Sequence, residues 1–152
     1  MRSVLFICLG NICRSVTAEE IFRTMVKRAG REAEFYIDSA GLIDYHEGEL
    51  ADARMRQHAS QHGYRLTHRS RPVRPADFDR FDLIVAMDQN NVKGLRNVAP
   101  NPEAEQKIVL MADYLREHSH SYVPDPYYGE AEDFELVIEL LEDACQGLLD
   151  EL

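Results

Sequence analysis

The chain has 152 residues, of which 45% are hydrophobic and 29% charged, and its formal net charge at pH 7 is −10. This size and composition predict one globular domain over residues 1–152, and no apolar run approaches the ~20 residues of a membrane span, so we expect no membrane insertion. Residues 101–152 hold 14 of the 27 acidic residues but only 2 of the 17 Lys and Arg, and this balance disfavours nucleic acid as a partner.

Short apolar runs predict four buried strands, at residues 4–7, 35–37, 83–87 and 108–111. Apolar residues at helical spacing predict helices over residues 18–29 and 134–148. A third helix is expected to begin at Asp52 and end near Gly63, and a fourth to begin after Asp88. Asp52 and Asp88 suit helix N-caps, and Gly30 suits the end of the first helix. Strands that alternate with helices predict an α/β fold: a four-stranded, mainly parallel sheet with helices on both faces. We interpret the acidic C-terminal residues mainly as a solvated helix face.

Three cysteines, Cys8, Cys13 and Cys145, cannot all pair within one chain. The apolar stretch near the N-terminus has only about six residues, shorter than the ~7–15 of a secretory signal. We therefore expect a cytoplasmic protein whose cysteines stay reduced. Cys8 and Cys13 have no histidine pair at metal-ligand spacing beside them, so we expect no bound metal.

The most informative segment is CLGNICRS, residues 8–15, between the first strand and the first helix. Backbone N–H groups at a helix N-terminus are unpaired, and Gly10 and Asn11 allow a tight curl, so the segment predicts an anion-binding loop. Arg14 supplies a guanidinium that matches two phosphate oxygens, and positive potential there favours the nucleophilic thiolate of Cys8. Together these groups predict phosphoryl transfer through a cysteinyl-phosphate. The alternative, a packing role for Cys8, leaves a positive residue at the helix start unexplained.

CLGNICRS, followed by TAEEIF, closely resembles the signature of the low-molecular-weight protein tyrosine phosphatases. The resemblance continues in DSAG (38–41), THRSRPV (67–73), FDLIVAMDQNN (81–91) and DPYYG (125–129), in the family's order. It implies a single phosphatase domain that hydrolyses phosphotyrosine in protein substrates without a cofactor. The phosphate-binding loop would contain residues that run without a gap: Cys8, Leu9, Gly10, Asn11, Ile12, Cys13, Arg14 and Ser15.

The resemblance also assigns roles. Cys8 would be the nucleophile, Arg14 the phosphate clamp, and Asp125 the general acid and then base, held between Pro124 and Pro126. The loop would be supported by a hydrogen-bonding set: Asn11, Ser15, Ser39, His68 and Asp88. Three tyrosines would line the mouth, Tyr45, Tyr127 and Tyr128, and a tyrosine kinase is a possible partner that would act on Tyr127 or Tyr128.

Cys13 would protect the nucleophile from over-oxidation through a reversible disulfide; the alternative is that it packs under the loop. Cys145 falls in the apolar stripe of the last helix and predicts a core residue. Ile12 favours tyrosine, because relatives that act on phosphoarginine tend to have threonine there. One departure from the family is Val16, where proline is usual; we expect it to tune the rigidity of the loop.

Two other functions compete with hydrolysis. A module that only binds phosphotyrosine would need no proton donor, and the presence of Asp125 favours turnover over that reading. The related arsenate reductases use two further cysteines around eighty to ninety residues into the chain, and this sequence has none there. A further hypothesis is that the acidic C-terminal third repels acidic phosphopeptides.

Overall fold

The computed structural model describes all residues 1–152 and contains one sheet of four parallel strands. The strands are β1 (Arg2–Cys8), β2 (Phe35–Gly41), β3 (Leu83–Ala86) and β4 (Ile108–Leu110), in the spatial order β2-β1-β3-β4. The predicted α/β class and four-stranded sheet are confirmed, and the sheet is parallel throughout.

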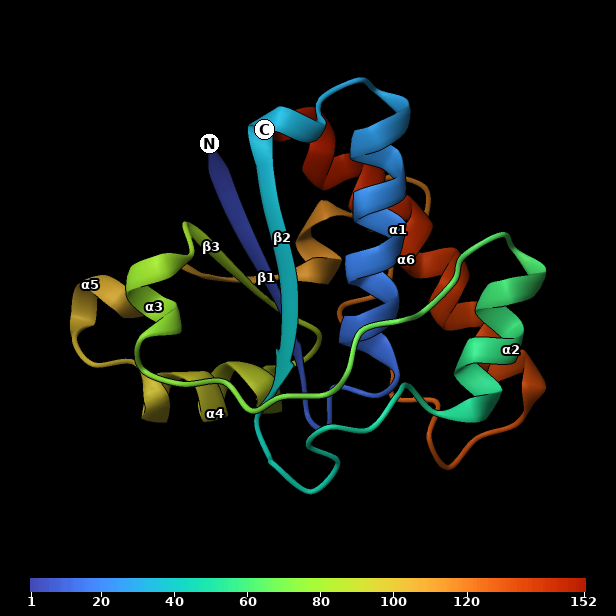
Figure 1. Ribbon diagram of the computed structural model, residues 1–152, viewed down its shortest axis with the longest axis horizontal. Coiled ribbons are helices and arrows are strands. Elements are labelled where there is room, and N and C mark those ends of the chain that lie inside the picture. Colours follow the sequence, from blue (N-terminus) through green and yellow to red (C-terminus); the bar gives the residue numbers. More distant parts are fainter.

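Helices cover both faces of this sheet, as Figure 1 shows. On one side lie α1 (Arg14–Arg28), α2 (Ala53–Gln61) and α6 (Ala131–Glu151), and on the other lie α3 (Asp77–Arg80), α4 (Gln89–Val98) and α5 (Pro102–Glu105). Two 3₁₀ turns, η1 (Glu32–Glu34) and η2 (Met111–Tyr114), flank β2 and β4. None of the helices combines the length and the apolar character that crossing a membrane would require.

The residues of β1 explain why the sheet needs cover on both sides. Val4 and Phe6 join the larger core under α1 and α6, whereas Leu5 and Ile7 join the smaller core under α3, α4 and α5. Alternate side chains of a strand point to opposite faces, so a continuous apolar run is what a doubly covered strand requires.

Two strand predictions extend one residue too far. The sequence predicts Met87 and Met111 as strand residues, but β3 ends at Ala86 and β4 at Leu110. Met87 leaves the ladder because its N–H bonds the side chain of Asn91 (3.1 Å). Met111 begins the η2 turn. Both are fully buried, and their apolar character therefore matched the strand pattern.

The predicted helix signals hold in the structure. Asp52 accepts hydrogen bonds from the backbone N–H groups at the start of α2, and Asp88 does so for α4. Gly30 lies just beyond α1 with φ 70°, a conformation that favours glycine. The acidic face of α6 is only partly free, because Glu135 binds His58 and His62, and Asp143 binds a third histidine, His118.

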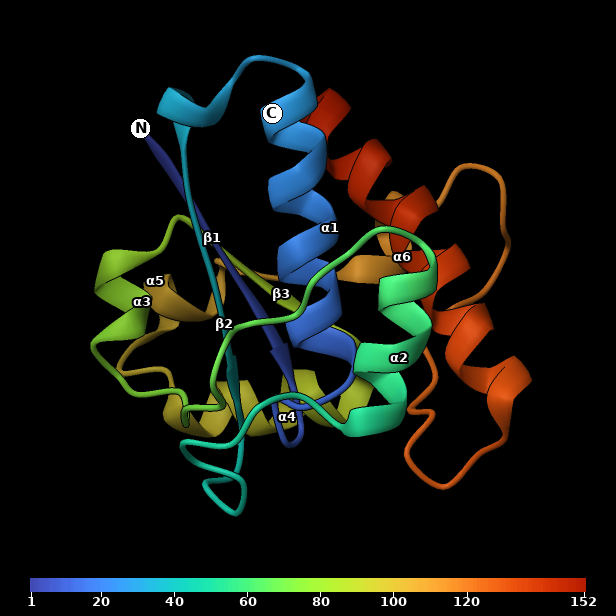
Figure 2. The same cartoon turned by 45° about the vertical axis from the view of Figure 1, so that its right-hand side comes forward.

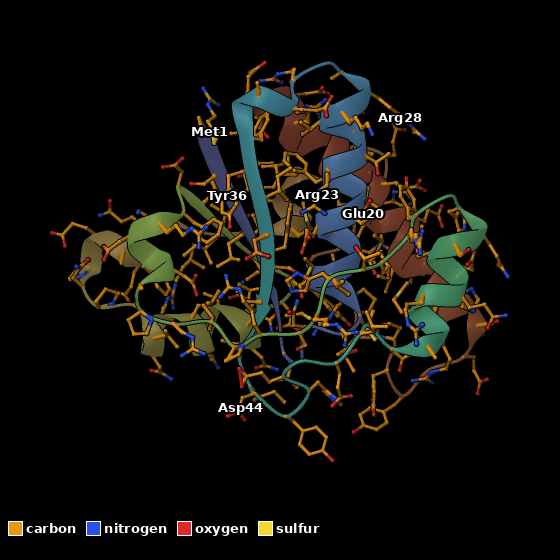
Figure 3. All side chains as sticks on the ribbon, in the orientation of Figure 1. Met1, Glu20, Arg23, Arg28, Tyr36 and Asp44 are labelled. Carbon is orange, nitrogen blue, oxygen red and sulfur yellow. The ribbon has the colours of Figure 1, made fainter.

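Both chain ends lie at the edge of the sheet where β1 begins. A side-chain N–H of Arg2 donates to the carbonyl of Leu152 (2.9 Å), which joins the two ends. Figure 3 shows Met1 at the end of the molecule opposite Asp44, a residue of the loop that follows β2. The carboxyl edge of the sheet is therefore far from both termini.

Candidate active site

The CLGNICRS loop connects the carboxyl end of β1 to the start of α1. In the sheet, β1 lies between β2 on one side and β3 on the other. The loop that follows β1 therefore lies at the point where the strand order reverses. Ligands of open parallel sheets bind at this kind of position. Figure 2 shows the loop that follows β2 close to the CLGNICRS loop, and it shows α2 beside α6.

The backbone of the loop is arranged to surround an anion. Its carbonyl groups are used by neighbouring segments: Leu9 accepts from the N–H of Leu42 (2.9 Å), and Gly10 accepts from the hydroxyl of Ser70 (2.9 Å). The N–H groups of residues 9–13 donate to no acceptor within the protein. A loop with its carbonyls held outward and its N–H groups free is an anion nest.

Asn11 supplies the curl and connects the loop to the nucleophile. Its φ of 57° makes it the one non-glycine residue in the left-handed region. Its side-chain NH₂ donates to the hydroxyls of Ser15 (2.7 Å) and Ser39 (3.0 Å). Ser15 Oγ lies 3.0 Å from Cys8 Sγ, and because Asn11 already donates to that oxygen, the Ser15 hydroxyl is free to donate to the sulfur.

The other end of the Asn11 amide is fixed by His68. Asn11 Oδ1 accepts from His68 Nε2 (3.0 Å) and from the N–H of Arg71 (3.2 Å). His68 Nδ1 faces Glu19 (3.2 Å) and Asp38 (3.4 Å). Four of the five predicted supporting residues thus form one connected network beneath the loop: Asn11, Ser15, Ser39 and His68. The fifth, Asp88, contacts Arg14 instead.

Sequence reasoning missed several members of this network. Glu19 accepts a hydrogen bond of 2.6 Å from Ser39, and Arg71 pairs with Asp38 (3.1 Å). A signal for Glu19 was present, because it lies one helical turn after Ser15 on a helix that starts at the site. Arg71 and Asp38 meet only through tertiary contact, and no local pattern indicates them.

Three of these side chains also have the composition of a cation site. Donor atoms of Glu19, Asp38 and His68 all lie within 4.8 Å of one another. Each already has a protein partner, however, and the guanidinium groups of Arg23 and Arg71 balance the two carboxylates. We therefore assign the cluster to support of the loop.

Gly41, rather than Gly10, is the glycine that the loop requires. A Cβ on Gly41 would lie 2.9 Å from the carbonyl oxygen of Leu9 and 3.1 Å from the Asn11 side chain. Gly10 does not have a positive φ, and a Cβ there would meet the ring of His46 at 3.3 Å and the Ile12 side chain at an ordinary 3.7 Å. The expectation that Gly10 makes the curl possible is corrected: Asn11 takes the left-handed conformation, and Gly41 provides the space.

Arg14 presents one edge of its guanidinium to the pocket. Its Nη1 donates to Asp88 Oδ2 (2.7 Å) and to the carbonyl of Val123 (3.0 Å). Its Nε is buried and bonds no protein atom, and its Nη2 lies 3.6 Å from Asp125 Oδ2. Burial acts to lower the pKa of Arg14, but the negative charges of Cys8, Asp88 and Asp125 outweigh it and raise that pKa. The Nε and Nη2 edge suits two oxygens of a phosphate.

Asp125 reaches the same pocket from the segment that connects η2 to α6. Its Oδ1 accepts from the N–H of Tyr127 (3.1 Å), and its side chain is 42% exposed at the pocket wall. Arg54 holds this segment in place by donating to the carbonyl of Tyr127 (2.9 Å). Asp125 therefore lies between the buried clamp and solvent.

One cavity of about 310 Å³ brings the predicted catalytic and mouth residues together: Cys8, Arg14, Asp125, Tyr45, Tyr127 and Tyr128. Cys8 lies at the base and is almost fully buried. At the rim, Tyr45 and Tyr128 are 79% and 95% exposed. Apolar walls come from loop residues such as Leu9 and Ile43. A narrow pocket with an anion nest below and aromatic rings above suits an aryl phosphate.

The two remaining cysteines differ in their access to this cavity. Cys13 is buried but lines it together with Cys8, and burial raises the pKa of the Cys13 thiol. Cys145 is fully buried on α6 and lies in the larger core, as predicted, where burial also raises the pKa of its thiol. No two cysteines are joined by a disulfide.

Comparison with known proteins decides the family. The family described as low molecular weight phosphotyrosine protein phosphatase matches residues 3–152. The chain belongs to this family.

Individual members of the family are similar over nearly the whole chain. The low molecular weight protein-tyrosine-phosphatase of Streptomyces coelicolor is 42% identical over 148 residues, which cover 96% of this chain and 90% of the relative. A crystal structure of the Entamoeba histolytica protein tyrosine phosphatase with Hepes in its active site has 42% identity and a TM-score of 0.96, covering 99% of this chain and 96% of that one. Vibrio vulnificus Wzb in complex with benzylphosphonate has 27% identity and a TM-score of 0.85, with 99% of both chains covered.

Val16 is a departure from the family's usual proline. It lies in the first turn of α1, is almost fully buried and joins the larger core. The helix begins at Arg14 without the proline, and the buried side chain of Val16 packs this turn against the core.

Proposed function

We propose that this member of the family is a protein tyrosine phosphatase that uses Cys8, Arg14 and Asp125. The observation that carries the proposal is the set of unpaired donors around the Cys8 sulfur. The free N–H groups of residues 9–13 and the Nε edge of Arg14 converge on one pocket. Such preorganised donors stabilise the charge that develops on a phosphoryl group in transfer.

The first chemical step forms the Cys8–phosphorus bond. The thiolate of Cys8 attacks the phosphorus atom, and the bond from phosphorus to the tyrosyl oxygen breaks. Asp125, in its acid form, donates its proton to that oxygen, so the product leaves as a neutral tyrosine. Arg14 stays bound to two phosphoryl oxygens throughout.

The second step releases phosphate. Asp125, now a carboxylate, removes a proton from a water molecule whose oxygen attacks the phosphorus atom. The bond to sulfur breaks, inorganic phosphate leaves, and the electron pair returns to Cys8. The hydroxyl of Ser15, 3.0 Å from the sulfur, stabilises this leaving thiolate. Neither step calls for a metal or a cofactor.

We infer that phosphotyrosine-containing proteins are the substrates. Tyr45, Tyr127 and Tyr128 form an aromatic mouth above a cysteine that lies at the pocket base. A phosphoserine side chain is shorter, so it cannot reach the nest while its backbone stays at this rim. Benzylphosphonate, the ligand of Vibrio vulnificus Wzb, likewise joins an aromatic ring to a phosphorus oxyanion.

The deciding experiment measures hydrolysis of p-nitrophenyl phosphate with EDTA present. Wild type should turn over, and Cys8→Ser should not. Asp125→Ala should lose about 10²–10⁴-fold with phenyl phosphate but less with better leaving groups, because only a poor leaving group needs the proton. An inactive wild type, or an active Cys8→Ser, would refute the proposal.

A redox role for Cys13 is supported by its place in the cavity with Cys8. Peroxide would oxidise the Cys8 thiolate to a sulfenic acid, and the Cys13 sulfur would displace hydroxide from it, giving a disulfide and water. After peroxide, dithiothreitol should restore wild type more fully than Cys13→Ser. Cys145→Ser is the control and should behave as wild type.

We also propose that the enzyme is cytoplasmic, because a regulatory thiol and three free cysteines fit a reducing compartment.

A tyrosine kinase is a further proposed partner. Tyr128 is 95% exposed and presents its ring at the rim of the pocket. Tyr127 is half buried and its ring lies under Arg54, so Tyr128 is the better acceptor. A broad tyrosine kinase should phosphorylate wild type in vitro, with the Cys8→Ser background preventing self-removal. Tyr128→Phe should remove most of the label and Tyr127→Phe little.

A further inference from the structure

A groove extends from the mouth of the catalytic pocket along α2. A second cavity of about 420 Å³ shares Ile12, His46 and Tyr127 with the catalytic pocket. A third, also about 420 Å³, shares Leu50 and Arg56 with the second. Because each cavity shares wall residues with the next, the three lie side by side along the surface. We call the second and third cavities together the arginine groove.

The groove takes its name from three exposed side chains, Arg56, Arg65 and Arg69. Arg56 donates one N–H to the carbonyl of Ala51, and Arg69 donates one to the carbonyl of Gly48. None of the three arginines lies within ion-pair distance of a carboxylate, and Arg65 makes no side-chain hydrogen bond at all. Their charges are therefore free to meet a ligand.

Acidic side chains offset only part of this charge. Glu49 and Asp52 line the second cavity, and Asp52 is paired with Arg54 (3.0 Å). Two guanidinium groups, those of Arg56 and Arg69, therefore face one carboxylate, that of Glu49, and the second cavity keeps an excess of positive charge. The third cavity has no acidic residue in its wall. A positive groove on a chain of net charge −10 is a local exception to the charge of the molecule.

The acidic C-terminal third lies elsewhere. Of its 14 acidic residues, only Asp125 lines the catalytic pocket, and none lines the arginine groove. Much of the rest is carried on α6, which packs behind α1 and α2 (Figure 2). Apart from Asp125, the acidic residues of this region therefore line neither the mouth nor the groove, although Glu142 accepts a hydrogen bond from Tyr64 in the groove wall (2.5 Å).

We propose that the arginine groove binds acidic side chains that flank the phosphotyrosine of a substrate. The proposal rests on the phosphatase function and names a substrate class for it: proteins with Asp or Glu within a few residues of the phosphotyrosine. An extended peptide advances about 3.3 Å per residue, so four residues reach about 13 Å from the mouth. Guanidinium groups along that path match carboxylates in charge and in geometry.

The test compares phosphotyrosyl peptides that differ only in their flanks. One peptide is neutral, and the others carry pairs of Asp on either the N-terminal or the C-terminal side, within four residues. At low ionic strength, wild type should favour one acidic series, with kcat/KM raised about two- to fivefold per acidic residue. The gain should reside in KM and disappear at high salt.

Charge reversal assigns the effect to the groove. The Arg56→Glu/Arg69→Glu variant should lose or invert the ratio of acidic to neutral kcat/KM, and the ratio cancels any common change in catalysis. Arg96→Glu is the matched control, since Arg96 is exposed on α4 and lines none of these cavities, and it should keep the wild-type ratio. Equal rates for acidic and neutral peptides with wild type, or an unchanged ratio in the double variant, would overturn the proposal.

The experiment separates this proposal from the phosphatase function itself. Failure of the function appears as a wild type that hydrolyses neither p-nitrophenyl phosphate nor any peptide. Failure of the groove appears as turnover that ignores the flanks. A second readout is binding of the same peptides to Cys8→Ser, where the acidic series should bind more tightly and Arg56→Glu/Arg69→Glu should remove the difference.

Discussion

The hydroxyl of Ser15 lies 3.0 Å from the sulfur of Cys8 while it accepts a 2.7 Å hydrogen bond from Asn11. This arrangement leaves its single proton for the sulfur. It makes Ser15 most useful when Cys8 must leave as a thiolate, which happens in the second step.

Ser15→Ala should therefore slow breakdown of the cysteinyl-phosphate. A hydrogen bond to a charged group contributes about 1.5–3 kcal/mol, so kcat should fall about ten- to a hundredfold. Rapid-mixing measurements should show a larger burst of p-nitrophenol than in wild type. Ser3→Ala, at a buried serine at the other end of β1, is the control and should change only stability. A normal kcat in Ser15→Ala would contradict this role.

Asp88 joins two functions, because it caps α4 and holds Nη1 of Arg14. Asp88→Asn keeps a good N-cap but removes the charge, so kcat/KM should fall about tenfold with little change in stability. Asp88→Ala should lose activity and also about 1 kcal/mol of unfolding free energy. Kinetics with p-nitrophenyl phosphate and urea unfolding check the two effects. Equal activity in Asp88→Asn and wild type would mean that the ion pair does not orient the clamp.

Gly41 gives a contrast with the glycine inside the loop. Gly41→Ala should lower kcat/KM more than Gly10→Ala does. A methyl group at residue 41 would press on the backbone of Leu9 at 2.9 Å, whereas one at residue 10 meets the movable ring of His46 at 3.3 Å. Affinity for inorganic phosphate should follow the same order. The reverse order would show that Gly10 has a conformational role after all.

His118 makes part of the stability depend on pH. Its ring binds Asp143 (2.7 Å) and Glu139 (3.1 Å), and these contacts raise its pKa above 6.5. Partial burial acts to raise the pKa of Asp143, but hydrogen bonds from His118 and from the backbone lower it below 3.8 overall. The histidine contribution is complete below pH 6.5 and is lost as pH rises through its raised pKa. The Asp143 contribution is complete above pH 3.8 and is lost as pH falls through its lowered pKa.

His118→Gln should therefore cost most unfolding free energy near about pH 5 and least near about pH 9. Urea unfolding at both values measures the difference. His120→Gln is the matched control, because His120 is exposed two residues away and makes no ion pair. A cost for His118→Gln that does not change with pH would show that shape, rather than charge, holds this loop on α6.

Sequence patterns predicted the sheet from its continuous apolar runs, and they predicted the longer helices from apolar residues at helical spacing or from an Asp N-cap. They did not predict α3 or α5, since a four-residue helix contains barely one turn and shows no period. Met87 and Met111 were assigned to strands because burial, which the pattern reports, continues past the end of the ladder.

The site divides in the same way. Cys8 and Arg14 followed from local chemistry, because the nest lies within eight consecutive residues. Asp125 and His68 came only from the family resemblance. Asp125 lies 110 residues after the end of the loop and His68 lies about 60 residues after its start, and no rule of spacing connects such distant positions to the loop. Arg71 was missed because its contacts with Asp38 and Asp77 exist only after folding.

The hydrogen bond from the Arg2 side chain to the Leu152 carbonyl places the N-terminal and C-terminal ends of the structure next to each other. Since this junction lies across the molecule from the mouth, a short linker could join the ends without approaching the site. A circular permutant opened in the exposed segment at residues 119–121, beyond the backbone bonds that Asp143 accepts, would retain the strand order and the nest. A solid support or a fluorophore attached at either end would leave the catalytic pocket facing away from the point of attachment.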